Sequence, residues 1–214
     1  MSDFHSDKPS FPDESVIIEI LSKEFPLDKI TLQKLVDQQG AHSEVREVII
    51  SNKEYVAKIV TEDYTYIDKE LPIAKICSDL KVGSKIIKTI RKNNIAIIIM
   101  EKYSIDLADY LLTYPSNRTL DKLMDKIGYK LQLIHNNGII HGDFTSDNIM
   151  LNSIDDIVII DYGCSYFSKE LHHRRSDWNS FNYIQKGINQ IKNGAIFKNK
   201  NDLLKAINPK CKHL

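Results

Sequence analysis

Residues 139–163 read IIHGDFTSDNIMLNSIDDIVIIDYG, and the interpretation of the whole chain starts from them. The segment begins as the end of an apolar strand, passes through a polar loop and a short apolar segment, and turns at Asp155 and Asp156. A second apolar strand, residues 157–160, leads into another acidic turn that begins at Asp161. Short apolar runs separated by turn residues predict buried strands joined by loops.

Three oxygen-bearing side chains stand at the ends of these apolar runs. Asp143 and Asn148 lie in the polar loop, and Asp161 follows the next strand. Two carboxylates and one amide oxygen are hard ligands that suit Mg²⁺, which usually also takes the phosphates of a substrate. Asp and Asn also cap turns, and these three residues alone do not exclude that structural interpretation.

Two motifs in this segment resemble those of protein kinases. HGDFTSDN, residues 141–148, resembles the catalytic loop, and DYG, residues 161–163, resembles the DFG metal motif at the family's usual separation. The resemblance implies that Asp143 is the catalytic base, which orients or accepts the proton of the attacking hydroxyl. It also implies that Asn148 and Asp161 hold Mg²⁺ on the phosphates of ATP. His141 would be a buried structural histidine.

Upstream of this segment, residues 29–60 are expected to form two or three antiparallel strands with a turn at residues 51–53. Kinases place a glycine-rich phosphate loop between their first two strands. When the sequences are aligned on Val45, this chain keeps only the middle glycine, Gly40. The resemblance makes Gly40 and Val45 nucleotide-binding residues, although an ordinary hairpin turn also fits this segment.

Lys58 in Val56-Ala57-Lys58 resembles the strand lysine of kinases that contacts the α- and β-phosphates. Glu70 follows in a predicted helix, residues 66–80, and an ion pair between Lys58 and Glu70 would fix the lysine against ATP. Pro72 lies in the same segment. A proline is tolerated in the first turn of a helix, so we expect the helix to begin shortly before it.

Two further strands, residues 85–91 and 94–100, precede a break to charged sequence at Glu101. In kinases this break is the hinge whose backbone binds adenine. The resemblance therefore makes Met100 the gatekeeper, and Glu101 and Tyr103 the backbone contacts, although an ordinary strand-to-loop transition looks the same.

Beyond residue 106 the pattern becomes helical. Residues 106–114 predict a short helix, and residues 119–138 predict a longer one with a cap at Asn117 or Thr119 and an end at Gly138. One apolar stripe runs along the longer helix: Leu120, Leu123, Ile127, Leu131 and Ile134. Residues 169–191 are expected to form one helix, and residues 201–210 a last short one. Asp177 resembles the buried helix aspartate that binds the backbone of the kinase catalytic loop.

These patterns predict an α+β fold with two lobes, as in protein kinases. The N-lobe would be a small antiparallel sheet, residues 14–101, and the C-lobe a reduced helical unit, residues 102–214. Residues 1–13 are polar and contain two prolines, which is typical of a flexible tail.

Composition limits the other function classes. The net charge of the 214 residues is zero, so the chain lacks the overall positive charge that is typical of nucleic-acid-binding proteins. The basic run at residues 172–175 still leaves local contact with RNA or an acidic partner open. The three cysteines are far apart, as is common in reducing compartments. No apolar run is long enough to span a bilayer, and the N-terminus does not resemble a signal peptide. We expect a soluble protein of the cytoplasm, and also of the nucleus.

Several features depart from ordinary protein kinases. Gly142 replaces the arginine that usually precedes the catalytic Asp, Thr145 replaces a lysine that is common in serine/threonine kinases, and no A-P-E sequence follows DYG. These departures occur together in the small atypical kinase subunit of the KEOPS (EKC) tRNA-modification complex, and HGDFTSDN and IDYGCSYFS resemble that family.

The resemblance implies an ATP- and Mg²⁺-dependent phosphotransferase acting on serine or threonine hydroxyls, with an ATPase role in a KEOPS-like complex. Its partners would be a protein substrate or other subunits of such a complex. Three alternatives stay open: a stand-alone compact kinase of viral or microbial type, a small-molecule kinase of the aminoglycoside or choline type, and a pseudokinase scaffold.

Overall fold

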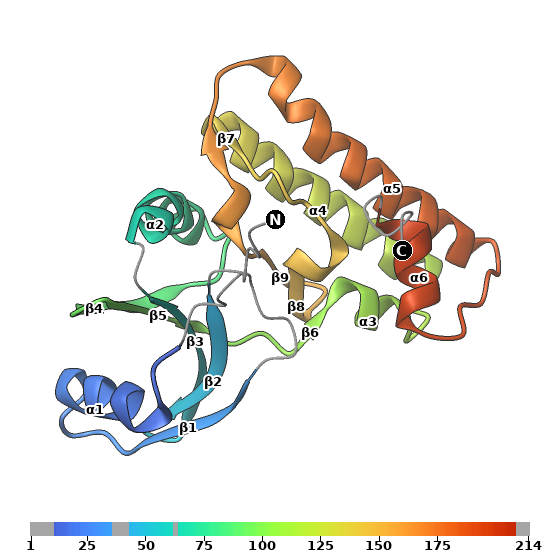
Figure 1. Cartoon of the computed structure of the whole chain (residues 1–214). Coiled ribbons are helices and arrows are strands. Elements are labelled where there is room, and N and C mark those ends of the chain that lie inside the picture. The colour runs from blue at the N-terminus through green and yellow to red at the C-terminus, as the bar shows by residue number, and fades with distance from the viewer. Residues whose placement is uncertain (1–10, 36–42, 62–63, 209–214) are drawn as a thin grey trace, which may run out of the picture. The chain divides into compact units, whose positions relative to one another are not determined.

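The computed structural model describes residues 11–35, 43–61 and 64–208 (Figure 1). Contacts between residues divide the chain into two compact units. The first unit comprises Met1–Asp68 and Lys85–Lys102, and the second comprises Lys69–Ser84 and Tyr103–Leu214. The segment 69–84 thus groups with the second unit by its contacts, whereas the sequence suggested a single boundary after residue 101. The lobe boundaries themselves stay a prediction.

The first unit is built on a five-stranded antiparallel sheet in the order β1-β2-β3-β5-β4. This confirms the antiparallel sheet that the sequence predicted. Asparagines form two of its turns: Asn52 and Asn93 have φ angles of 64° and 52°, in the left-handed region that Asn enters more readily than most residues. The strands are β1 (Ile30–Leu35), β2 (Glu44–Ile50), β3 (Lys53–Thr61), β4 (Ile86–Lys92) and β5 (Ile95–Glu101).

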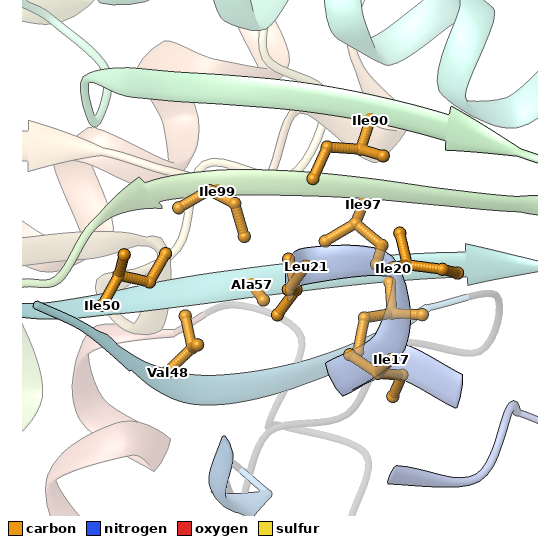
Figure 2. Packing of buried hydrophobic residues seen from close by; sticks show 10 residues of the cluster. Ile17, Ile20, Leu21, Val48, Ile50, Ala57, Ile90, Ile97 and Ile99 are labelled. Atoms are coloured by element: carbon orange, nitrogen blue, oxygen red, sulfur yellow. The ribbon is translucent and has the colours of Figure 1, made fainter. Parts of the chain in front are cut away.

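Helix α1 (Glu14–Glu24) covers one face of this sheet. Its apolar side presents Ile17, Ile20 and Leu21 to the strands, and all three are buried (Figure 2). Side chains alternate between the two faces of a strand. Ala57 and Ile59 of β3 belong to the core beneath α1, so Lys58 between them projects from the opposite face. The sheet residues of this core are Val48, Ile50, Ala57, Ile59, Ile90, Ile97 and Ile99.

Helix α2 (Tyr64–Asp79) contains Pro72 in its interior rather than in its first turn, so the sequence prediction was wrong on this point. A proline inside a helix removes the hydrogen bond to the carbonyl four residues earlier, here that of Asp68. Both Pro72 and Asp68 are exposed, so water can replace the lost donor. The helix is therefore retained by its buried side, which includes Ile73 and Cys77.

The second unit combines short strands with helices. A three-stranded sheet has the order β6-β8-β9, and β7 pairs with β10. Helices α4 and α5 lie side by side in Figure 1. The strands are β6 (Ile105–Asp106), β7 (Ile139–Ile140), β8 (Ile149–Ser153), β9 (Asp156–Ile159) and β10 (Tyr166–Phe167). The helices are α3 (Leu107–Leu111), α4 (Asn117–Asn136), α5 (Arg175–Lys192) and α6 (Lys200–Ile207), with 3-10 turns η1 (Ser146–Asn148), η2 (Tyr162–Cys164) and η3 (Leu171–Arg174).

Helix α4 buries the stripe that the sequence predicted, from Leu120 to Ile134. Its cap differs from the prediction. The N-cap is Ser116, whose extended backbone (ψ 153°) lets the hydroxyl accept a hydrogen bond from the N–H of Thr119 at 3.3 Å. Serine satisfies an otherwise unpaired amide of the first turn in this way. After the helix, Gly138 has a φ of 70°, as expected of a glycine that ends a helix.

The predicted helix over residues 169–191 begins later than expected. A 3-10 turn, η3, precedes α5, which starts at Arg175. The hydroxyl of Ser168 accepts a hydrogen bond from the N–H of Glu170 and pairs with His173 Nδ1 at 2.7 Å. These local bonds hold the chain in a turn before the helix. None of the helices in the described residues is both long and apolar enough to cross a membrane.

Gly187 lets α5 pack closely against α6. A Cβ atom built at Gly187 would lie 2.0 Å from Cγ2 of Ile207, which is fully buried. Overpacking of a filled core distorts its surroundings, so we expect Gly187→Ala to lower the free energy of unfolding by about 2 kcal/mol. Chemical denaturation followed by circular dichroism would measure the loss.

Gly128 in α4 provides the matched control for this prediction. Its added Cβ would lie 3.2 Å from the ring tip of Phe181, a side chain that is only half-buried. Alanine also favours helix over glycine by about 1 kcal/mol, so Gly128→Ala is expected to be neutral or stabilising. Equal effects at the two glycines would contradict the packing argument.

Candidate active site

The polar loop that follows β7 is closed by its own side chains. The amide Nδ2 of Asn148 donates to the backbone carbonyl of Asp143 at 2.8 Å and lies 3.3 Å from the carboxylate Oδ2 of the same residue. Asn148 is only 8% exposed, whereas Asp143 is partly buried. Because an amide carries its nitrogen and oxygen on opposite sides, this contact turns the oxygen of Asn148 away from Asp143.

Asp161 lies next to this loop because β8 and β9 form an antiparallel pair. The N–H of Ile160 donates to the backbone carbonyl of Asn148 at 2.9 Å, which places the following residue beside the loop. Asp161 is exposed and has a φ of 62°, a conformation that Asp adopts more readily than most residues. The structure thus brings Asp143, Asn148 and Asp161 together, three residues that the sequence predicted to share one site.

His141 is buried at the start of the loop and both of its ring nitrogens are engaged. Nδ1 accepts a hydrogen bond from the N–H of Asp143 at 3.3 Å, and Nε2 lies 3.0 Å from the carbonyl of Ile160, to which it donates. Burial lowers the pKa of His141, although the negative charges of Asp177, Asp161 and Asp143 oppose that effect. The ring is therefore neutral and holds the loop to β9, as expected of a structural histidine.

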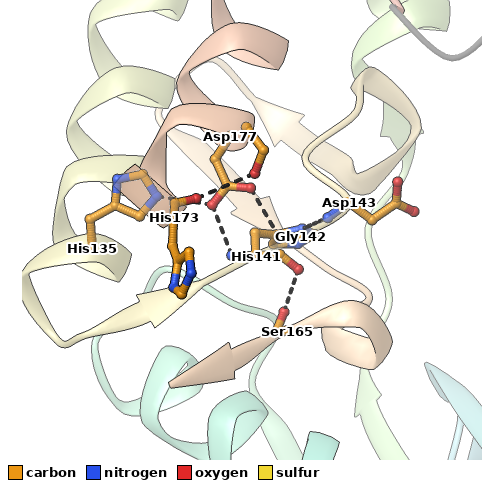
Figure 3. Close-up of polar contacts among 8 residues, drawn as sticks. His135, His141, Gly142, Asp143, Ser165, His173 and Asp177 are labelled. Atoms are coloured by element: carbon orange, nitrogen blue, oxygen red, sulfur yellow. Dashed lines mark hydrogen bonds and ion pairs between the residues drawn. The ribbon is translucent and has the colours of Figure 1, made fainter. Parts of the chain in front are cut away.

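Asp177 of α5 fixes the loop backbone from the other side (Figure 3). Its Oδ2 accepts hydrogen bonds from the N–H of His141 and from Nε2 of His135, both at 2.9 Å, and its Oδ1 accepts from the N–H of Gly142 at 3.0 Å. Burial alone would raise the pKa of Asp177, but these three donors together lower it. Figure 3 shows the carboxylate of Asp143 directed away from Asp177 and its three donors.

Two contacts at the loop were not visible in the sequence. The hydroxyl of Ser165 donates to the carbonyl of His141 at 2.8 Å. Gly142 has a φ of 77°, and a Cβ at this position would lie 2.5 Å from the carbonyl oxygen of Cys164. The arginine that kinases usually carry at this point therefore does not fit here. The paired signal, a glycine before Asp143 and a serine after DYG, could have suggested this close approach.

Tyr162 anchors the DYG turn inside the second unit. Its side chain is buried, and its hydroxyl donates to the carbonyl of Ile159 at 2.8 Å. Burial raises the pKa of Tyr162 well above its ordinary value, so the hydroxyl stays protonated and keeps donating. The same hydroxyl packs against Gly83, where a Cβ atom would lie only 2.9 Å away. Asp161 is thus held from both sides, by Ile160 and by Tyr162.

The remaining predicted residues are distributed over the two units. In the first unit, Lys58 is 7% exposed and pairs with Val45 across β2 and β3. Met100 and Glu101 end β5, and the N–H of Glu101 donates to the carbonyl of Lys85 at 3.0 Å, so an adenine contact by Glu101 would use its carbonyl. Gly40 lies outside the described residues.

Glu70 and Tyr103 belong to the second unit. Glu70 lies in α2 and is only 5% exposed, which is unusual for a carboxylate. The hydroxyl of Tyr103 donates to Oδ1 of Asp156 at 3.2 Å, which fixes the start of this segment on the β8–β9 turn.

A comparison with protein families shows to which family the chain belongs. The profile described as "Protein kinase domain" matches residues 34–186, which is more than half of the chain. This chain belongs to the protein kinase domain family. The matched residues include the HGDFTSDN loop, the DYG turn and the strand that carries Lys58, which are the parts that the sequence analysis assigned to the kinase motifs.

Curated relatives of this kinase domain match over shorter stretches. Serine/threonine-protein kinase PknD of Chlamydia muridarum is 35% identical over 68 residues, or 31% of this chain. A probable bifunctional tRNA threonylcarbamoyladenosine biosynthesis protein of Methanosarcina mazei is 37% identical over 68 residues, or 32% of the chain. The EKC/KEOPS complex subunit bud32 of Dictyostelium discoideum is 34% identical over 59 residues, or 27% of the chain. The matches cover 7%, 11% and 23% of these three relatives' own lengths.

The donor set of the kinase domain fits a magnesium ion that is shared with a nucleotide. Among the described residues no group of three or more His, Cys, Asp and Glu side chains forms a self-contained metal site. One carboxylate, Asp161, and one amide, Asn148, instead lie on neighbouring backbone segments, which the bond from the N–H of Ile160 to the carbonyl of Asn148 joins. Mg²⁺ is typically bound in this manner, with few protein ligands and with phosphate oxygens and water completing its octahedron. The residues present therefore suit a metal that arrives with its substrate.

Proposed function

We propose that this kinase domain is an ATP- and Mg²⁺-dependent phosphotransferase that acts on serine or threonine hydroxyls of a protein. One observation carries the proposal. The amide of Asn148 is hydrogen-bonded to Asp143, and its backbone carbonyl is bonded to the strand end that carries Asp161. A base and two metal ligands are thus held in one cluster of the second unit, as phosphoryl transfer requires.

Each residue of the cluster receives a separate role. Asp143 orients the attacking hydroxyl and accepts its proton, because its carboxylate is partly exposed and points away from Asp177. The oxygens of Asn148 and Asp161 would hold the metal. Bound Mg²⁺ would neutralise charge that develops on the phosphate oxygens. The residues of the chain act mainly by positioning the reacting groups, because phosphoryl transfer requires little covalent chemistry from the protein.

The other predicted residues bind the nucleotide in this proposal. Lys58 takes the α- and β-phosphates, and Glu70 holds Lys58 in place. Met100 lines the adenine site, with backbone groups of Glu101 and Tyr103 as its polar contacts. Gly40 and Val45 cover the phosphates. Lys58 and Glu70 are 7% and 5% exposed, and buried charged groups of this kind are normally paired.

A second candidate function is ATP hydrolysis within a KEOPS-like complex for tRNA modification. The names of the Methanosarcina and Dictyostelium relatives favour it. A feature of this chain agrees with it: the close approach of Gly142 to Cys164 leaves no room for the arginine that couples many protein kinases to a phosphorylated activation loop. Control by a partner protein would replace control by phosphorylation.

Nucleotide binding gives the first test of the proposal. ATP with Mg²⁺, at about a hundred times its dissociation constant, is expected to raise the melting temperature by about 5 °C, and ATP with EDTA by clearly less. A difference between the two arms reports the metal held on the phosphates. If neither arm moves the melting temperature, the chain is a pseudokinase and the proposal fails.

Transfer of ³²P from ATP then separates the enzyme classes. Label on serine or threonine of a generic protein supports the main proposal, whereas label on sugars or amines in a small-molecule panel contradicts it. ATP hydrolysis without any labelled acceptor, stimulated by a threonylcarbamoyl-transferring partner that elutes with the chain in gel filtration, supports the second candidate.

A further inference from the structure

Lys200, the first residue of helix α6, binds two carboxylates near the catalytic loop. The ammonium of Lys200 lies 2.8 Å from Oδ2 of Asp109 and is also hydrogen-bonded to Oδ2 of Asp106. Asp106 caps α3 at the same time, because its Oδ1 accepts from the N–H of Asp109 at 2.9 Å. Asp106 is only 9% exposed, so water screens this ion pair weakly. The charge of Lys200 therefore counts for more here than in a surface pair.

Asp106 connects this ion pair with the catalytic loop. It belongs to β6, and it pairs with Met150 of β8, two residues beyond Asn148. The amide of Asn148 in turn holds Asp143. A continuous set of contacts thus runs from Lys200 through Asp106 and β8 to the proposed metal ligand and the proposed base.

A third carboxylate belongs to the catalytic loop itself. Asp147 lies in η1, immediately before Asn148, and its Oδ1 is buried with no hydrogen-bond partner among the described residues. Burial above all, and then the negative charges of Asp106 and Asp109, raise the pKa of Asp147, and the positive charge of Lys200 opposes that effect. Without Lys200, the carboxylates of Asp106 and Asp109 would repel each other beside β8, the strand that follows the catalytic loop.

The chain presents Lys200 to these carboxylates from a fixed segment. The hydroxyl of Tyr114 accepts from the N–H of Phe197 at 2.8 Å and donates to its carbonyl at 3.0 Å. Asn199 then caps α6 by accepting from the N–H of Asp202 at 3.0 Å. The backbone on both sides of Lys200 is therefore held, and its side chain loses less freedom on forming the ion pair.

We infer that Lys200 is a positioning residue for phosphoryl transfer: by neutralising the carboxylates of Asp106 and Asp109, it holds the catalytic loop in its working geometry. The inference rests on the proposed function for its kinetic consequence. Misplacement of reacting groups by about 1 Å costs up to about a hundredfold in rate. Lys200→Met is therefore expected to lower kcat between about tenfold and a hundredfold while the KM for ATP stays within about twofold.

Three further variants distinguish positioning from general stabilisation. Lys200→Arg keeps the charge and should retain most of kcat. The double variant Asp109→Asn with Lys200→Met removes one repelling carboxylate and should recover part of the kcat lost in Lys200→Met. Lys205→Met is the matched control, because Lys205 lies on the same helix, is exposed, and has its ammonium 3.9 Å from Oδ1 of Asp202. If Lys200→Met fails to fold, Lys200→Gln, which keeps an N–H donor without charge, takes its place in the test.

Hydrogen exchange supplies a readout that does not depend on catalysis. Amides of residues 144–149 should exchange faster in Lys200→Met than in the wild type or in Lys205→Met. Faster exchange in a chain that transfers no phosphate would support the inference and reject the proposed function. Unchanged exchange, a kcat equal to that of Lys205→Met, or a loss that Asp109→Asn does not relieve would overturn the inference.

Discussion

Asp161→Asn is expected to lower Mg²⁺-dependent phosphoryl transfer by about a thousandfold or more, because it removes the only carboxylate in the cluster that is proposed to ligate the metal. Asparagine keeps the size of the side chain and tolerates the left-handed backbone of residue 161, where φ is 62°. The fold should therefore be retained, and the effect should be chemical. Transfer of ³²P from ATP, measured with circular dichroism on the same samples, tests both statements.

Asp155→Asn is the matched control for this substitution. Asp155 lies in the β8–β9 turn, is exposed, and forms its ion pair with Lys126, away from the cluster. Its replacement should leave the transfer rate within about twofold of the wild type, because surface ion pairs contribute little. Normal turnover in Asp161→Asn would refute the metal assignment. An equal loss of transfer rate in Asp155→Asn would mean that any acidic residue near β9 is required, and would also contradict the assignment.

Asp177→Asn is expected to lower the free energy of unfolding by about 3 kcal/mol, the cost of losing a buried charged acceptor. The carboxylate accepts three hydrogen bonds, from His135, His141 and Gly142. An asparagine has one acceptor oxygen and one donor group, so at least one of these buried donors would face another donor. Urea denaturation would measure the change.

The pH dependence of this loss has a definite sign. The pKa of Asp177 is lowered in the folded protein, so the carboxylate stabilises the fold fully above its unfolded pKa of about 3.9. That stabilisation disappears as the pH falls through the folded pKa, below this value. The stability difference between the wild type and Asp177→Asn should thus be constant from about pH 8 to pH 5 and shrink below about pH 4.

Asp121→Asn serves as the control for Asp177→Asn. Asp121 is on α4 in the same unit and binds Lys192 of α5 at 2.6 Å, but its side chain is 63% exposed. Its replacement should change stability by less than about 0.5 kcal/mol. If Asp177→Asn lowered the free energy of unfolding as little as Asp121→Asn does, the claim that the three hydrogen bonds hold the catalytic loop would be wrong.

Much of the candidate site could be predicted because its residues are close in sequence. Asp143 and Asn148 share one loop, and the β8–β9 hairpin returns the chain to Asp161. Local pattern and turn residues determine such a segment. The stripe of α4 was predictable for a similar reason, since its buried residues follow the helical period. Asp177 was found only through the resemblance to kinases.

Other features escaped prediction because their causes are distant contacts. Pro72 lies inside α2, where exposure to water relieves the cost that the local rule predicts. Lys200 and Asp106 are separated by 94 positions in the sequence. An ion pair between such residues leaves no periodic signal, because a charged residue that covers a buried carboxylate looks like any surface lysine until the fold brings the two together.

The amino-acid sequence was sufficient to predict which groups are proposed to carry the chemistry, the antiparallel sheet of the first unit and the helices of the second. These features follow from motif, period and turn residues, which act over a few positions. How the loop is held became visible only in three dimensions: by a buried carboxylate from α5, by the close approach of Gly142 to Cys164, and by a lysine from α6. These polar contacts are strong because they are desolvated, and desolvation exists only after distant segments have packed.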